Sequence, residues 1–470
     1  MSPGKSVAFF VTFLAACSPS VRAQPVVTAT LSNVTRIEGW SYFQPTLDPL
    51  AITQAAIGDP DYVFVGDRAE LGVRVEGSRF DLGGAFNYVR LENLPGRAIG
   101  PGGLGNGAFY FAASGVRYSY QLYMSELTVK VKSRRRAMAV TFGRMPFSSG
   151  AGVLMPDRLS SRLVGNFESS LYQRRFDGVR IDVGQSTTRF TAAAFVPTQG
   201  GFEESTNLSM PRVQIGAAEW TRSAGGAQYQ AFAYGYRDRR RNTAVVDNTA
   251  SRDRPAAIGI ATVGGSYARV SPTRFGELDA LAWGAVQAGD WYGRTHRAAS
   301  VALEGGHRWI RAAMKPWLRA GYLWASGDRD RRDARHATFF PMLPSSRQYA
   351  LSSVFTQMNL RDAFAQLSIE PRRFRARIEV HDVGVASGAD LWYQGSGATA
   401  SDDRFFGFSG RFAGGATSLG TVVEGTVDVP IRKPWSISAY AATMTAGGVV
   451  RQFFTDKRLM TWSIDNVIRF

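Results

Sequence analysis

The chain has 470 residues, of which 12% are aromatic, with 50 glycines, one cysteine and a mean hydropathy of −0.15. A single cysteine excludes a disulfide framework and a thiolate metal site. After the N-terminal leader no apolar run of about 18 residues follows, which excludes a transmembrane helix. The formal net charge of +17 favours an anionic partner. Because no helix-turn-helix, zinc-finger or RNA-binding signature is present, we expect no nucleic-acid role.

Residues 1–23 have the features of a secretory signal peptide. Lys5 supplies a positive charge, residues 7–16 form an apolar stretch, and small residues precede Gln24. Cys17 ends a Leu-Ala-Ala-Cys sequence similar to a lipoprotein acylation site, so it is either acylated or a chance match within the leader. We favour the chance match, and we predict that residues 24–470 form a single domain.

Alternation of apolar and polar residues with period 2 recurs along the whole mature chain, which is typical of strands with one wet and one apolar face. Each such segment is long enough to cross a bilayer as a tilted strand, which takes about 9–11 residues. Eighteen strands are predicted, over residues 32–43, 62–76, 79–92, 121–132, 136–146, 171–184, 187–197, 210–222, 227–238, 256–270, 273–288, 297–311, 315–325, 360–371, 374–386, 419–430, 434–446 and 458–470.

The connections between these strands alternate in length. They are short after every even-numbered strand and long after nearly every odd-numbered one, as in outer-membrane barrels whose short turns face the periplasm. We therefore predict an all-β fold: one transmembrane antiparallel barrel of about 18 strands, with long extracellular loops, in the outer membrane of a Gram-negative bacterium. Its surroundings would be outer-membrane lipid and lipopolysaccharide. The terminal Phe470 resembles the signal read by the barrel-assembly machinery.

Charged side chains gather on one face of several predicted strands. An arginine on the lipid face near the midplane costs about 2–4 kcal/mol, so these faces must point into the lumen. There the charges either pair with one another and stiffen the wall, or form a basic path for an anionic solute. The candidate solute-binding residues are Arg68, Arg74, Lys130, Arg144, Arg174, Arg180, Arg319, Arg375, Arg377 and Glu379.

Short motifs that occur in order along most of the mature chain resemble the alginate-export family of outer-membrane barrels. The resemblance implies an eighteen-stranded, monomeric barrel with an arginine-rich lumen, through which an anionic polyuronate or a related solute passes without chemistry. A specific uptake porin for small anionic nutrients and a structural or adhesion barrel are the alternatives. The motifs are RIEGW (36–40), FGR (142–144), RFDGVR (175–180), GYLWASGD (321–328), Thr338-Phe339 with Pro341, Asn359-Leu360, and Glu424 with Asp428.

Other motifs give no support to an enzyme, a cofactor or a metal site. Residues 100–105 match GxGxxG, but they lie in a long loop where we expect no helix, so a dinucleotide site is not predicted. Asp328, Asp330 and Asp333 lack the glycine and the final glutamate of an EF-hand loop and are predicted to be solvated or to face lipopolysaccharide. The four histidines are scattered, without an evident Ser or Cys partner.

Overall fold

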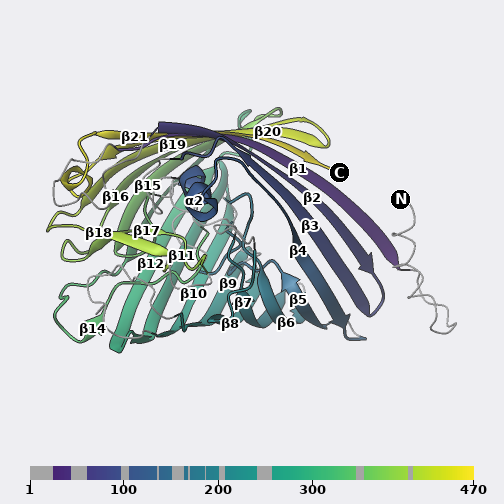
Figure 1. Cartoon of the computed structure of the whole chain (residues 1–470). Helices are drawn as coiled ribbons and strands as arrows, with labels where there is room; N and C mark the ends of the chain where they lie inside the picture. Colours follow the sequence, from purple (N-terminus) through teal and green to yellow (C-terminus); the bar gives the residue numbers. More distant parts are fainter. Residues whose placement is uncertain are drawn as a thin grey trace.

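A barrel of antiparallel strands forms most of the chain in this computed structural model (Figure 1). The structure describes residues 25–43, 61–96, 105–134, 137–150, 163–167, 170–185, 187–200, 207–240, 257–345, 354–400 and 406–470. The predicted signal peptide, with Cys17, lies outside them. The eighteen barrel strands are β1 (Val26–Ser41), β2 (Asp61–Glu76), β3 (Phe80–Glu92), β4 (Ser119–Lys132), β5 (Met138–Met145), β6 (Phe176–Gln185), β7 (Thr188–Pro197), β8 (Val213–Ala224), β9 (Ala227–Asp238), β10 (Ile258–Thr273), β11 (Gly276–Trp291), β12 (Arg294–Arg308), β13 (Trp317–Ala325), β15 (Leu360–Ile369), β16 (Arg375–Gly384), β19 (Ser418–Arg432), β20 (Trp435–Ala446) and β21 (Arg458–Arg469).

The barrel is closed by its first and last strands. β1 pairs with β2 along its whole length, and Ser32–Ser41 also pair with Arg469–Met460 of β21. Among the described strands of the barrel, each has a neighbour on both sides, so no sheet edge is left open to lipid. The predicted all-β, closed, eighteen-stranded fold is confirmed.

Two of the predicted strand boundaries are wrong by more than three residues. β1 begins at Val26 rather than residue 32, because residues 26–30 extend beyond the end of β21 and pair with β2 alone. β6 begins at Phe176 rather than residue 171, because the chain before it turns at Gln173, which has a φ of 60°. The other boundaries are correct to within three residues.

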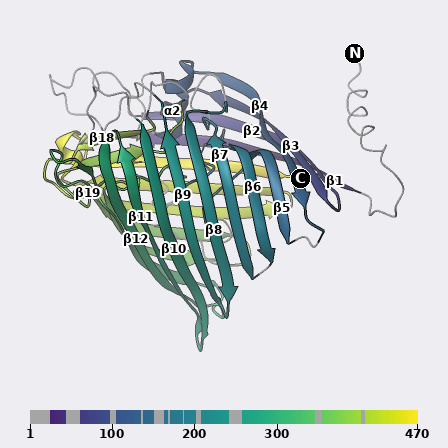
Figure 2. The ribbon, with the colours of Figure 1, turned by 90° about the horizontal axis from the view of Figure 1, so that it is seen from below.

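The two ends of the barrel differ as predicted. One end carries short connections, such as residues 225–226 between β8 and β9, whereas the other carries long ones (Figure 2). The exception at the long-loop end is the two-residue turn between β11 and β12. Outward-facing apolar side chains such as Leu71 and Leu303 are 53% and 62% exposed, which suits a surface that faces lipid. None of the described helices is long and apolar enough to span a membrane.

Segments of the long loops form elements of their own inside the ring of strands, and the sequence analysis did not predict them. These are α2 (Gly105–Ser114) and a hairpin of β17 (Leu391–Gly395) and β18 (Phe408–Phe412) (Figure 1). The two-residue β14 (Arg335–His336) pairs with β12, and η2 (Val450–Gln452) is a short 3₁₀ turn. The expectation that no helix follows the glycine motif is therefore wrong. α2 does not directly follow a strand, so the context of a dinucleotide fold is still missing.

The hydrophobic core lies within the lumen, at the long-loop half. Phe340, Trp392 and Phe408 from the inner segments are almost completely buried and belong to one cluster with wall residues such as Phe195 and Tyr236. The rings of Tyr236 and Phe340 meet edge to face with centroids 5.1 Å apart. The inner segments, which we call the plug (α2 and residues 163–167, 170–175, 338–345, 391–400 and 406–412), therefore fill this half with packed side chains.

Candidate functional site

The short-turn half of the lumen contains a charged cavity of about 260 Å³. Strands β2 to β7 supply its walls, near the turns that join β2 to β3, β4 to β5 and β6 to β7. Because side chains alternate along each strand, the residues that point inward here are the polar ones. The charged lining residues are Arg74, Glu76, Asp81, Glu126, Lys130, Arg180, Asp182 and Arg189.

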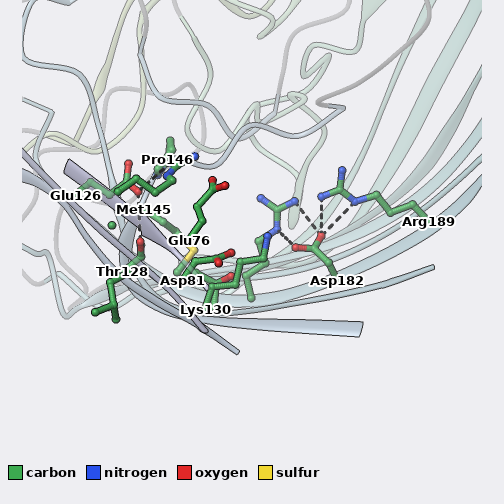
Figure 3. Close-up of a pocket in the computed structure, with 14 residues that line it drawn as sticks. Glu76, Asp81, Glu126, Thr128, Lys130, Met145, Pro146, Asp182 and Arg189 are labelled. Atoms are coloured by element: carbon green, nitrogen blue, oxygen red, sulfur yellow. Dashed lines mark hydrogen bonds and ion pairs between the residues drawn. The ribbon is translucent and has the colours of Figure 1, made fainter. Parts of the chain in front are cut away.

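Ion pairs hold some of these charges but leave two of the arginines more than half exposed. Arg74 lies 3.6 Å from Glu126 and keeps 58% of its side chain exposed. Asp182 pairs with two arginines, since its carboxylate is 2.9 Å from Arg180 and 2.8 Å from Arg189, which is 53% exposed (Figure 3). One carboxylate between two guanidiniums leaves a net positive charge at this point of the wall.

Lys130 and Arg68 are the candidates with the fewest partners. Lys130 lines the cavity and makes no ion pair with a described residue. Arg68 is half-buried, and its Nε has no hydrogen-bond partner within the described part of the chain. Arg68 interacts electrostatically with Glu70 and with the like charge of Arg175. Lys130 can therefore offer its charge to a solute in the cavity, whereas Arg68 is not among the residues that line it.

Arg375 lies at the rim of the short-turn end. Its side chain is 63% exposed and its Nη2 is 2.8 Å from Glu370 in the adjacent turn. Arg308 contacts the other oxygen of Glu370 at 2.6 Å. The hydrogen bond from Arg375 holds the pKa of Glu370 below its usual range. Arg375 and Arg308 therefore surround the single carboxylate of Glu370, as two arginines surround Asp182 in the cavity.

Two further candidates are mainly paired within the wall. Arg144 binds Asp177 through two parallel hydrogen bonds of 2.7 and 2.8 Å, which joins the FGR motif to the RFDGVR motif of the next strand. Arg377 lies 3.3 Å from Glu379, which is almost fully buried. For these residues the alternative of internal charge pairing describes the structure better than a solute path.

Arg174 and Arg319 differ most from the expectation, because both are completely buried and neither reaches the open lumen. Arg174 donates to backbone carbonyls of the plug, including those of Leu343 and Ser396 at 3.2 and 3.0 Å. Burial lowers the pKa of Arg174 to about 9, which leaves it charged at neutral pH. Arg319 lies between two wall carboxylates, 3.1 Å from Asp279 and 2.9 Å from Glu304.

The RIEGW motif fixes α2 inside the barrel. Glu38 is completely buried and accepts hydrogen bonds from Trp40 Nε1 at 2.8 Å and from Asn106 Nδ2 of α2 at 3.2 Å. Arg36 makes two hydrogen bonds of 2.7 Å to Asp465 of β21. The motif therefore joins the closing strand pair to the plug.

Asp390 connects two long loops at the base of the inner hairpin. Its buried carboxylate accepts four hydrogen bonds, and it joins the loop after β13 to the loop after β16. Burial raises the pKa of Asp390 to about 6, against the lowering effect of these hydrogen bonds. The donors are the backbone N–H groups of Asp328 and Leu391, both at 2.7 Å, and the hydroxyls of Thr338 at 2.5 Å and Tyr393 at 2.7 Å.

The sequence analysis missed several lining residues that the same alternation could have identified. Arg189 follows the turn into β7 and precedes Phe190, which is exposed on the outer face, so period 2 places Arg189 in the lumen. Asp182 follows by the same argument from its own strand. The partners of each arginine could not be found this way, because they depend on register between strands.

Comparison with known proteins agrees with this geometry. A sequence model described as alginate export matches residues 120–457, which is 338 of the 470 residues. The chain belongs to the alginate export family. A comparison with curated proteins found no match.

Solved structures of outer-membrane porins share the fold. OccAB4 of Acinetobacter baumannii has 8% identity and a TM-score of 0.56, over 96% of this chain and 100% of that one. OccD3 of Pseudomonas aeruginosa has the same identity and TM-score, over 96% and 93%. OccK2 of the same organism, solved in complex with glucuronate, has 10% identity and a TM-score of 0.53, over 94% and 98%. Family and fold together identify a porin-like barrel of the outer membrane.

Proposed function

We propose that this barrel is a passive channel for anionic solutes in the outer membrane of a Gram-negative bacterium. The preferred solute is an anionic polysaccharide such as alginate, or a uronate. The observation that carries the proposal is the set of accessible cations at the short-turn mouth, where Arg74 and Arg189 are more than half exposed and Lys130 has no ion pair with a described residue.

Such a mouth can bind and release a carboxylate without chemistry. A guanidinium forms paired hydrogen bonds with a carboxylate and replaces part of its water shell. Glu76 and Glu126 line the same cavity, so they compete with the solute and keep each contact weak. Conduction requires this balance, because a solute that binds too strongly does not leave.

The plug supports a second candidate, uptake of small anionic nutrients such as uronates or aromatic acids. An extended polymer would have to displace segments that are packed by Phe340, Trp392 and Phe408 and anchored by Arg174. A small solute needs only a gap beside them. A barrel of the same fold, OccK2, was solved with glucuronate, which is a solute of this size.

The same proposal includes the partners of the barrel. We expect a monomer surrounded by lipid and lipopolysaccharide, which suits the exposed apolar outer face. We also expect the barrel-assembly machinery to recognise Phe470, whose ring is 72% exposed while its backbone N–H bonds to Leu31 at 2.8 Å.

Planar-bilayer recording of the refolded barrel tests the function. The reversal potential under a salt gradient should show anion selectivity, and oligouronates should block the current in a concentration-dependent way, whereas neutral oligosaccharides of the same length should not. Block by monomeric uronates alone would favour the uptake channel. Unselective current without block, or no current, would contradict the proposal.

A further inference from the structure

A second charged cluster lies in the opposite wall of the barrel, away from the cavity. Glu379 and His381 of β16 and Glu424 of β19 are all buried, and their potential ligand atoms lie within 4.8 Å of one another. Residues two apart on a strand share a face, so Glu379 and His381 both point into the lumen. The arrangement does not depend on which solute the channel passes.

The register of the sheet places two carboxylates side by side. Glu379 is directly opposite Glu424, and Gln366 of β15 is directly opposite Glu379 on its other side. Like charges in such cross-strand pairs are destabilising. Burial removes the water that would screen them, so this pair requires a proton or a cation between its members.

His381 is oriented for metal binding. Its Nδ1 is 3.0 and 3.1 Å from the two carboxylate oxygens of Asp362, and both side chains are completely buried. This contact fixes a ring proton on Nδ1, so Nε2 is the nitrogen that can bind a metal ion, which would take the place of its proton. Nε2 has no hydrogen-bond partner within the described residues. A carboxylate behind a histidine is the usual support for a metal ligand, because it fixes the tautomer and the ring orientation.

The charge balance of the cluster is negative. Among the described residues, Glu379, Glu424 and Asp362 contribute three carboxylates, and Arg377 pairs with Glu379 at 3.3 Å. Without a metal ion, a proton on His381 and a proton shared by Glu379 and Glu424 balance the two remaining negative charges. A divalent cation bound to the neutral imidazole would replace both protons. Tyr440 donates to one oxygen of Glu424 at 3.2 Å, and the carboxyl group of Glu424 faces that of Glu379. The Oε1 of Gln366 is buried without a hydrogen-bond partner among the described residues.

We propose that Glu379, His381 and Glu424 bind a divalent transition-metal ion such as Zn²⁺. One imidazole nitrogen and two carboxylate oxygens are a ligand set that zinc accepts. The amide oxygen of Gln366 or a water completes the coordination, and Asp362 is the positioning residue behind His381. The bound ion joins β16 to β19 at the point where their carboxylates oppose each other. The expectation of no metal site arose because these ligands lie on two strands 43 residues apart (424 − 381) and form no contiguous motif.

Zinc titration of the refolded full-length barrel in detergent tests this site. After treatment with EDTA, we expect one Zn²⁺ per barrel by calorimetry and elemental analysis, and a higher Tm with zinc. Glu424→Gln and His381→Gln should each weaken binding at least tenfold, and Asp362→Asn by about 10- to 100-fold. His307→Gln, far from the cluster, is the control and should bind like wild type.

The Tm of wild type and of Glu424→Gln, each measured with and without zinc, separates metal binding from a purely structural role. Glu424→Gln removes the like-charge contact, so the metal-free variant should have a higher Tm than metal-free wild type, yet gain nothing from zinc. Three results would overturn the site: no stoichiometric zinc in the wild type, zinc binding that persists in both ligand variants, or loss of binding in His336→Gln instead. The last result would place the ion at the buried pair of His296 and His336, whose Nδ1 atoms are 2.8 Å apart.

Discussion

Charged side chains have different surroundings in the two halves of the lumen. At the short-turn mouth, Arg74 and Arg189 are exposed and their ion pairs are open to water. At the long-loop half, Glu38, Arg174 and Asp390 are buried and bond to the plug. The same alternating pattern therefore produces cations that can meet a solute and anchors that fix inner segments. Exposure and hydrogen-bond partners distinguish the two, not residue type.

The energetic consequences of the two arrangements also differ. An exposed ion pair contributes about 0–1 kcal/mol to stability, because water competes with it. Removing one partner of a buried pair costs about 3–5 kcal/mol, since the remaining charge is left uncompensated. Substitutions at the mouth should therefore change conduction, and substitutions at the anchors should change stability.

The largest loss of stability is expected when Glu38, which fixes α2, is replaced. Glu38→Ala leaves Trp40 Nε1 and the Asn106 amide without their acceptor and removes one partner of Arg36, so we expect a loss of about 3–5 kcal/mol in the free energy of unfolding. Urea unfolding measures it, and single-channel conductance should rise as α2 is released. Glu76→Ala at the mouth is the control and should cost about 1 kcal/mol or less. Equal losses in both variants would remove the distinction between the halves.

A smaller change in the free energy of unfolding is expected when the pH is varied, and it arises from Asp390 at the base of the inner hairpin. The pKa of Asp390 is raised to about 6, above the value of about 3.9 in an unfolded chain, so the folded state holds the proton more tightly. This contribution to stability is complete below about pH 4 and is lost as pH rises through 6, a change of about 2–3 kcal/mol.

Asp390→Asn tests this sign, because asparagine does not titrate. Between pH 4 and pH 7, the wild type should lose more unfolding free energy than the variant. If the two proteins change in parallel over this range, Asp390 does not titrate as proposed.

The smallest change in the free energy of unfolding is expected from substitutions in the charged cavity at the short-turn end. Arg74→Ala and Arg189→Ala should each lower the anion-to-cation permeability ratio about fivefold, since one charge at 4 Å in water is worth ~1 kcal/mol. Stability should hardly change. Arg237→Ala, on the exposed outer face of β9, is the matched control and should leave selectivity unaltered. Loss of selectivity in the control as well would mean that the lumen charges do not set it.

The wall of the barrel could be predicted from sequence because its signals are local. Period-2 alternation and the sorting of short and long connections located the strands, and the cost of a charge in lipid assigned their faces. β1 and β6 were misplaced where a strand extends beyond its neighbour or where the chain turns inward.

The plug and the pairing of charges could not be predicted. α2 has the sequence GNGAFYFAAS, whose glycines and small residues give a weak helix signal, and it is fixed by Glu38, 68 residues earlier in the chain. Arg174 looked like a lumen cation because nothing in its neighbourhood shows that Leu343 and Ser396 would surround it. Such contacts depend on how distant loops pack.

Thiol labelling compares the two halves most directly. In a background where Cys17, the single cysteine, is replaced by serine, Thr128→Cys places a thiol in the charged cavity and Ala398→Cys places one in the plug, where the native side chain is 1% exposed. An anionic thiol reagent should modify the cavity thiol at least ten times faster than the plug thiol, and should reduce the current through it. Equal rates, or faster labelling of the plug, would contradict an open short-turn end with accessible cations and a packed long-loop half.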